Sequence, residues 1–258
     1  MAQRASELIG AAETLYGREL TPEITREIGE QLRSGIAEAL GFLANIIMCD
    51  YLNRWNNADE RNLVDAQIAV DAAKRYSADV AIVHYAQGFI YRAEDRHPEA
   101  EAAFQKSRDL NPGSVRTKAQ LAAEMLYNGK FDEALNQIDL AINEGTGNPA
   151  LGMFQWIKGR TLFFKEQYKE AIPCLQASVD SWPNLWYNWL YLASAYAQDG
   201  DTQKAGELLV EFKRRFQGYD TITEVIAAEQ TNPNKNPEVE KGRAAFHKGL
   251  KDAGMSWN

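Results

Sequence analysis

Small residues recur along this chain at a nearly constant interval, and this rhythm restricts the possible folds more than any other feature. Alanine returns every 34 residues at Ala66, Ala100 and Ala134, and, after one step of 37, at Ala171 and then, 34 later, at Ala205. A second series keeps the same steps at Gly88, Ala122, Gly159 and Ala193. A period of this length indicates a chain built from stacked copies of one short structural unit.

The best-preserved copy is Ala81–Ser114, whose pattern predicts two amphipathic helices joined by a tight turn. A glycine or alanine at the helix crossing lets the backbones approach, and a large residue one turn later, such as Tyr91, fills the space beside it. One such pair cannot bury its apolar face alone, so several pairs must stack. The single longer step coincides with Glu144–Pro149, a glycine-rich connector of the kind that accepts insertions at little cost.

With closing prolines at Pro112, Pro149 and Pro183, these positions resemble the tetratricopeptide repeat family. The resemblance covers Ala81–Tyr219 as four units, residues 81–114, 115–148, 152–185 and 186–219. It extends to a degenerate unit, 47–80, in which Arg54 stands where the first helix usually has a small residue. The resemblance implies an all-α fold, a right-handed solenoid of helix-turn-helix repeats.

More loosely, residues 159–205 are similar to the C-terminal repeat modules of some bacterial nucleotide cyclases and transcriptional regulators. We find neither a cyclase segment nor a DNA-binding segment in the sequence. This second resemblance therefore implies a bacterial lineage and no activity, because one repeat fold serves many functions.

Residues 1–46 do not follow the repeat and are expected to form an N-terminal helical cap. Thr21 and Pro22 predict a helix start, since threonine caps helices and proline suits their first turn. An apolar stripe follows, and Gly35 and Gly41 within it favour a bend or two separate helices. The segment either caps the stack or lies in its groove.

Residues 220–258 are expected to form C-terminal capping helices. The amphipathic stretch Pro237–Ala253 is predicted to cover the last apolar face of the solenoid, as terminal repeats require. Gly254 is predicted to end this helix, because glycine readily adopts the left-handed conformation that closes helices.

Composition limits the partners. The formal net charge of −8 argues against binding to nucleic acid or to an anionic membrane. We find no signal peptide and no window of about 18 apolar residues, so we expect a cytoplasmic chain that is not bound to a membrane. Cys49 and Cys174 lie far apart in apolar helical runs and are expected to be buried, reduced thiols.

No set of residues has the spacing of a catalytic site. His84, His97 and His247 are not paired with cysteines or carboxylates at metal-ligand spacing. The connector Glu144–Pro149 lacks the Gly-Lys-Ser/Thr ending of a phosphate-binding loop. We therefore expect a protein that is not an enzyme and that holds no metal and no cofactor.

The resemblance implies a concave groove lined by the first helix of each unit. Carried over position by position, its lining is aromatic with scattered arginines, and comprises Tyr51, Trp55, Tyr85, Phe89, Arg92, Arg116, Trp156, Arg160, Phe163, Tyr187 and Tyr191. Aromatic residues and arginine are enriched at binding hot spots. The lysines and asparagines with which family members clamp the acidic tails of heat-shock chaperones are absent from these positions, so that partner is not expected.

Three functions remain open at this point. The chain is a scaffold or adaptor that binds a peptide or helix of a protein partner in the groove, with Arg92, Arg116 and Arg160 engaging carboxylates or carbonyls. Alternatively, it is a regulatory module that binds a small molecule near Trp156, or a structural homo-oligomer. The groove itself is open, filled by the chain's own end or by a second copy, or simply part of the core.

Overall fold

A computed structural model of the chain describes residues 22–53, 59–229 and 236–258, and these residues are almost entirely helical. The chain divides into two compact units, residues 1–90 and 91–258. The expectation of an all-α fold is confirmed.

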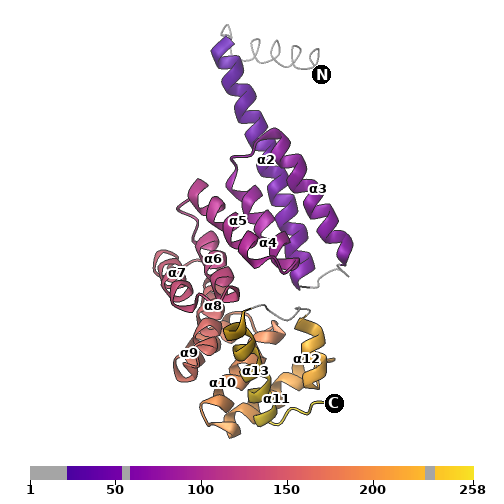
Figure 1. The fold of residues 1–258 in the computed structure, drawn as a ribbon, viewed down its shortest axis with the longest axis vertical. Helices are drawn as coiled ribbons and strands as arrows, with labels where there is room; N and C mark the ends of the chain where they lie inside the picture. The colour runs from indigo at the N-terminus through magenta and orange to yellow at the C-terminus, as the bar shows by residue number, and fades with distance from the viewer. Residues whose placement is uncertain (1–21, 54–58, 230–235) are drawn as a thin grey trace. The chain divides into compact units, whose positions relative to one another are not determined.

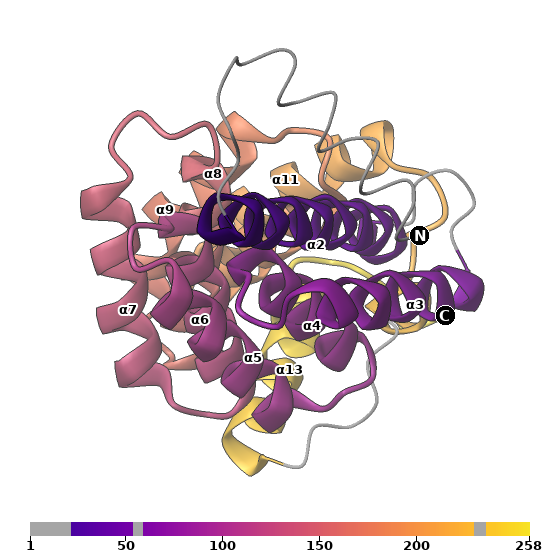
Figure 2. The ribbon, with the colours of Figure 1, turned by 90° about the horizontal axis from the view of Figure 1, so that it is seen from above.

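The first unit is built on α2 (Pro22–Asn53) and α3 (Glu60–Tyr76), which pack side by side (Figures 1 and 2). Asp59 caps α3, because its carboxylate accepts a bond from the Arg61 backbone N–H at 2.9 Å. The next helix, α4 (Ala81–Ala93), begins in this unit. Its residues Ile82 and Val83 lie directly against the backbone of α2.

Helix α2 is continuous, so the alternative of two separate helices, expected from Gly35 and Gly41, is wrong. Gly41 is a contact point rather than a breaker: a Cβ added there would lie 2.8 Å from Ile82 and 3.1 Å from the Val83 backbone nitrogen. Tertiary packing thus decides the conformation where helix propensity alone predicted an interruption. Because α2 runs on to Asn53, it also passes through the boundary predicted between residues 46 and 47.

Part of α2, Arg26–Leu52, is long enough and apolar enough to cross a membrane. The expectation that no window has this length and composition is therefore wrong. Length and composition are all that this helix, near the N-terminus, shares with a membrane span, and most of the segment is exposed. A signal sequence or the core helix of a globular domain meets the same two criteria.

The second unit is a succession of antiparallel helix pairs (Figure 1). Within it, most helices pack on their neighbours in the chain. Its helices are α5 (His97–Leu110), α6 (Val115–Tyr127), α7 (Phe131–Glu144), α8 (Leu151–Phe164), α9 (Tyr168–Ser181), α10 (Trp186–Gln198), α11 (Thr202–Arg215), α12 (Ile222–Glu229) and α13 (Pro237–Asp252).

The backbone repeats with the same rhythm as the sequence. Asp95, Gly129, Glu166 and Gly200 have φ values of 55°, 75°, 61° and 97°, and they follow one another at steps of 34, 37 and 34 residues. Each lies just after the first helix of a pair, where a left-handed residue ends the helix. In each case the next N–H bonds to a carbonyl five residues back, as Lys130 does to Met125 at 2.8 Å. The turn is thus as regular as the spacing of small residues.

After α12 and α13, the chain returns to the start of α12. The backbone N–H of Ile222 donates to the Ser256 carbonyl at 2.9 Å, and the Thr223 hydroxyl donates to the Trp257 carbonyl at 2.7 Å. Gly254, with φ of 101°, lies just beyond α13, so the helix stop predicted there is confirmed.

Candidate functional site

The first helices of successive pairs, α6, α8 and α10, contact one another and form one side of the second unit. Helix α13 packs along α10 and α8 (Figure 1). The prediction of a helix at 237–253 is confirmed, but its place is not the expected one. It lies on the row of first helices, the surface predicted to be the groove, instead of only capping the last pair. We call this surface of α8 and α10 the inner surface.

Phe246 is the centre of this contact. Its ring stacks on Tyr191 of α10, with centroids 4.0 Å apart and planes inclined by 7°. The same ring meets Phe163 of α8 edge-on, with centroids 6.5 Å apart. Phe246, Tyr191 and Phe163 are all buried. The single ring of Phe246 therefore packs against residues of two different repeat units, Tyr191 and Phe163, and we call this position the seat.

Polar groups fix the position of α13 along this surface. The Ser194 hydroxyl donates to the Phe246 carbonyl at 2.9 Å, and the Gln198 amide donates to the Ala245 carbonyl at 2.6 Å. At the start of α13, the Asn236 amide donates to the Asn128 carbonyl at 2.9 Å, in the turn that follows α6. Because hydrogen bonds are directional, these contacts define one register for the helix.

Two glycines bring the α13 backbone close to the inner surface. A Cβ at Gly242 would lie 2.4 Å from the Phe164 ring, and a Cβ at Gly249 would lie 2.1 Å from the Ser194 hydroxyl and 2.8 Å from the Ser194 carbonyl oxygen. Glycine inside a helix destabilises it by about 1 kcal/mol relative to alanine. At these two positions this cost is offset by close packing, so α13 is fitted to the surface it covers.

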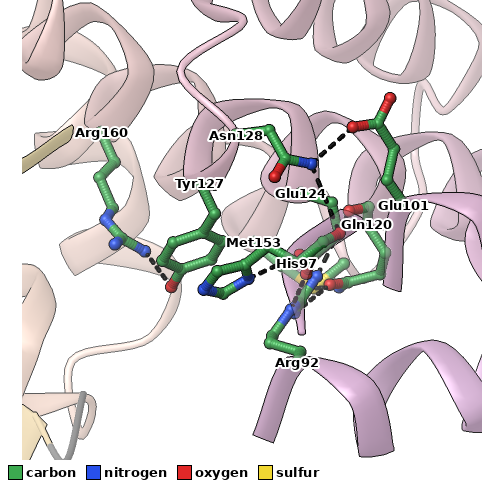
Figure 3. Close-up of polar contacts among 9 residues, drawn as sticks. All are labelled: Arg92, His97, Glu101, Gln120, Glu124, Tyr127, Asn128, Met153 and Arg160. Carbon is green, nitrogen blue, oxygen red and sulfur yellow. Dashed lines mark hydrogen bonds and ion pairs between the residues drawn. The ribbon is translucent and has the colours of Figure 1, made fainter. Parts of the chain in front are cut away.

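Next to this seat, Arg160 of α8 lies among aromatic rings. Its guanidinium donates to the Tyr127 hydroxyl at 2.7 Å and sits 4.7 Å from the centroid of that ring (Figure 3). It lies 5.7 Å from the Trp156 ring and 5.6 Å from the Tyr191 ring. Cation–π contacts with several rings stabilise the charge of the guanidinium.

A chain of polar contacts continues from Tyr127 toward the end of α4 (Figure 3). The His97 ring stacks on Tyr127 at 4.6 Å, and its Nδ1 lies 3.0 Å from the Glu124 carboxylate. Glu124 has no exposed surface and forms an ion pair with Arg92. Arg92 also donates to the Gln120 side-chain oxygen at 2.8 Å. A buried carboxylate needs such partners, because an uncompensated charge in the interior is very unfavourable.

The structure brings together five of the predicted groove residues, Trp156, Arg160, Phe163, Tyr187 and Tyr191. Phe163 and Tyr191 are buried under α13, while Trp156, Arg160 and Tyr187 are only partly buried. Burial raises the pKa of the Tyr187 hydroxyl to about 12, and the nearby Tyr127 acts in the same direction. This part of the surface is thus poorly hydrated.

The remaining predicted residues lie apart from this cluster. Arg92 is engaged with Glu124 and Gln120 inside the protein, whereas Arg116 is exposed on α6. In the first unit, Tyr85 meets the buried Phe89 edge-on at 5.0 Å, and Tyr51 is partly buried. Trp55 lies outside the described residues. Phe246, Gly242 and Gly249 were missed, although two glycines seven apart with a phenylalanine between them on one helix are a signal of close packing.

A shallow, open hollow of about 440 Å³ lies elsewhere in the second unit, between α5 and the turn after α6. It is lined by Pro98, Glu101, Ala102, Gln105, Asn128 and Lys130. Within this lining, Glu101 already bonds to Asn128 and Lys130. Over the described ranges, no group of three or more histidines, cysteines or carboxylates could hold a metal ion.

A tetratricopeptide repeat family model matches residues 158–219, which include α9, α10 and α11 and all of the predicted unit 186–219. The chain is also similar to the BBSome complex member BBS4 homolog of Drosophila melanogaster, with 29% identity over 136 residues. These residues are 49% of this chain and 28% of that protein, so the chain spans little more than a quarter of the length of this curated relative.

Solved structures show the same architecture. Pseudomonas aeruginosa pilF aligns with a TM-score of 0.59 and 15% identity, over 84% of this chain and 90% of that one. PilW, a widely conserved type IV pilus biogenesis factor, aligns with a TM-score of 0.58 and 15% identity, over 81% and 97%. The repeat spacing, the helix pairs and the family match agree that the chain contains tetratricopeptide repeats, with the family model covering residues 158–219. Repeats of this kind are typical of protein-interaction scaffolds.

Proposed function

We propose that this chain is a non-catalytic scaffold that binds an amphipathic helix of a partner protein on the inner surface of α8 and α10. One observation carries the proposal: this surface already holds a helix, α13, with Phe246 seated on Tyr191 and Phe163. A partner helix would take the same seat when α13 leaves it. Grooves that hold amphipathic helices are a recurrent mode of protein recognition.

The contacts of α13 define what such a partner must carry. The seat accepts one aromatic side chain, as Phe246 shows. Four residues before it and three residues after it, the close approach of Phe164 and Ser194 requires small residues. The partly exposed Trp156 and Arg160 beside the seat offer further contacts to a helix longer than α13. The partner is therefore a helix with an aromatic residue flanked by small ones on its apolar face.

The comparisons support a role in assemblies without naming the partner. The curated relative is a BBSome complex member homolog, and PilW is a type IV pilus biogenesis factor. A small-molecule sensor is less well supported, because the hollow described above is open and is not lined by Trp156. An adaptor role agrees with both the occupied inner surface and the family.

The test uses the full chain with α13 loosened. In the variant Gly249→Ala the new methyl group meets the Ser194 backbone, so α13 is expected to leave its seat part of the time. The probe is a fluorescent peptide with the sequence of residues 236–253. We expect this peptide to bind Gly249→Ala at micromolar concentration, to bind the unmodified chain at least about tenfold more weakly, and to lose binding when its own Phe246 is alanine.

Gly206→Ala is the matched control. Gly206 is also a helical glycine near α13, but a Cβ there would lie 3.6 Å from the Ala253 carbonyl oxygen, an ordinary contact. This variant should bind the peptide no better than the unmodified chain. If Gly249→Ala keeps its helical circular dichroism and yet fails to bind the peptide, α13 is a permanent part of the core and the proposed exchange is wrong.

A further inference from the structure

The outer face of α2 carries an apolar stripe that the described residues of the first unit leave exposed. Its residues follow one another at alternating steps of four and three, and all are exposed: Ile28, Leu32, Gly35, Ala39, Phe42 and Ile46. This spacing keeps side chains on one side of a helix. None of the charged residues between 26 and 46 falls on the stripe.

The stripe lies opposite the face by which α2 is packed in its own unit. That packed face consists of Ala37, Gly41, Ala44 and Met48, which are all buried. At 100° per residue, the centres of the two faces are roughly 170° apart. The packing of α2 against the other described residues therefore does not explain the apolar character of its outer face.

The order of large and small residues along the stripe is the same in both directions. Ile28 and Leu32 are large, Gly35 and Ala39 are small, and Phe42 and Ile46 are large. The order is therefore the same from either end. If two copies of α2 lie antiparallel about residue 37, Ile28 faces Ile46 of the second copy, and Leu32 faces its Phe42. Gly35 then faces Ala39 at the centre, where small residues let the two helices approach.

The exposed area is sufficient for a specific pair. Six large side chains on or beside the stripe are between 39% and 64% exposed: Ile28, Leu32, Ile36, Phe42, Leu43 and Ile46. Together they present on the order of 500 Å² per copy, and a symmetric pair buries about 1,000 Å², the size at which specific interfaces begin.

The composition favours protein over lipid as the occupant of this face. Glu38 lies in the middle of the apolar segment and would be costly to place within a bilayer. To enter a membrane, α2 would also have to leave α3 and α4, against which its opposite face is packed. The formal net charge of −8 further disfavours approach to anionic headgroups.

We propose that this stripe is the interface of a homodimer, in which α2 of each copy packs antiparallel against α2 of the other around a two-fold axis. Such an interface is self-complementary, as closed dimers require. It is independent of the inner surface of α8 and α10, so either proposal can fail without the other.

The test is sedimentation of the full chain from micromolar to submillimolar concentration. We expect a dimer for the unmodified chain and a monomer for Leu32→Glu/Ile46→Glu. The dissociation constant of the dimer should be at least about 100-fold higher for the variant. The matched control is Leu140→Glu/Val210→Glu, which places the same charges at exposed apolar positions of α7 and α11. The control should remain dimeric, and circular dichroism should show equal helix content in all three proteins.

Orientation is read by disulfide formation in a background with Cys49→Ser and Cys174→Ser. A chain with Ile28→Cys should cross-link to a chain with Ile46→Cys, and neither should cross-link to itself. Cross-linking of like chains alone would overturn the antiparallel arrangement.

Other occupants give distinct results that also overturn the proposal. If the full chain is monomeric and a chain without residues 1–21 dimerises, the protein's own N-terminal segment covers the stripe. If the chain stays monomeric and floats with phosphatidylcholine vesicles, whereas the double glutamate variant does not, lipid is the occupant. A dimer that survives the double variant, or a monomer under every condition, removes the stripe as an interface.

Discussion

In α13 the apolar residues share one face and the charged residues take the others, whereas α2 has apolar residues on two opposite faces. The single apolar face of α13 is covered by α8 and α10. In α2 the buried face consists mainly of small residues. The large residues lie on the opposite face and are exposed. The burial pattern of a helix thus indicates where its partners are: the partner of α13 lies within the chain, and α2 has one partner within it and room for another.

The two helices also differ in how their glycines are used. Gly242 and Gly249 of α13 sit at points of contact, where a Cβ would collide with Phe164 or Ser194. In α2, Gly41 has this role, whereas Gly35 has nothing within 4 Å of an added Cβ. A glycine that packs against nothing in its own chain weakens the helix without compensation, unless a second chain lies there.

The largest contrast is expected between the aromatic centre of α13 and the stripe of α2. Phe246→Ala should lower the free energy of unfolding by about 3–5 kcal/mol, because it removes a fully buried ring and leaves a cavity. Ile46→Ala should change it by less than about 0.5 kcal/mol in a dilute sample, because Ile46 is mostly exposed there.

Urea unfolding at two protein concentrations measures both variants. If the stripe is a dimer interface, Ile46→Ala becomes destabilising only in the concentrated sample, since dimer formation stabilises by mass action. If Phe246→Ala and Ile46→Ala lower the free energy of unfolding equally in the dilute sample, the outer face of α2 is already covered within one chain.

A second contrast concerns carboxylates. Glu124→Gln should lower the free energy of unfolding by about 3 kcal/mol, because it leaves the Arg92 charge without its buried anion. Glu38→Gln, on an exposed part of α2, should change it by less than about 0.5 kcal/mol. The double variant Arg92→Met/Glu124→Leu should recover most of the loss in urea unfolding. If the double variant loses as much free energy of unfolding as Glu124→Gln does, the broken ion pair is not the cause of the loss.

In a third contrast, two glycine-to-alanine variants should change the free energy of unfolding in opposite directions. Gly249→Ala should destabilise the chain by about 1–3 kcal/mol, because its methyl group collides with the Ser194 backbone. Gly35→Ala should stabilise it by about 0.5–1 kcal/mol, because alanine is the better helix former and meets nothing there. Thermal unfolding in dilute solution distinguishes the two directions. Stabilisation by both alanines would show that α13 is held loosely.

The repeat architecture was predictable because spacing and packing are linked directly. Ala66, Gly88 and their successors are small for one geometric reason, so their rhythm predicts helix pairs and even the turns at Gly129 and Gly200. The continuity of α2 was not predictable, because Gly41 breaks helices by propensity and is kept helical by its contact with Ile82 and Val83.

The candidate site was predictable only in part. Family positions led to Tyr191, Phe163 and Arg160, and the structure gathers these residues. The occupant could not be read from them, since the amphipathic pattern of 237–253 fits an end cap and an inner surface equally well. The ion pair of Arg92 with Glu124 was also hidden, because residues 32 positions apart meet only through the stacking of repeats.

The last effect concerns the hydration of the inner surface and appears only in alkali. With a pKa near 12 in the folded chain and an ordinary value of 10.0, Tyr187 keeps its proton on folding while the unfolded chain loses it. Its contribution is therefore complete below pH 10 and is lost as pH rises from 10 to 12. Tyr187→Phe cannot ionise, so the difference in unfolding free energy between the two proteins should shift over this range in favour of the variant. The measurement is urea unfolding of both proteins at several pH values, and a constant difference would mean that water reaches Tyr187 beside Trp156 freely.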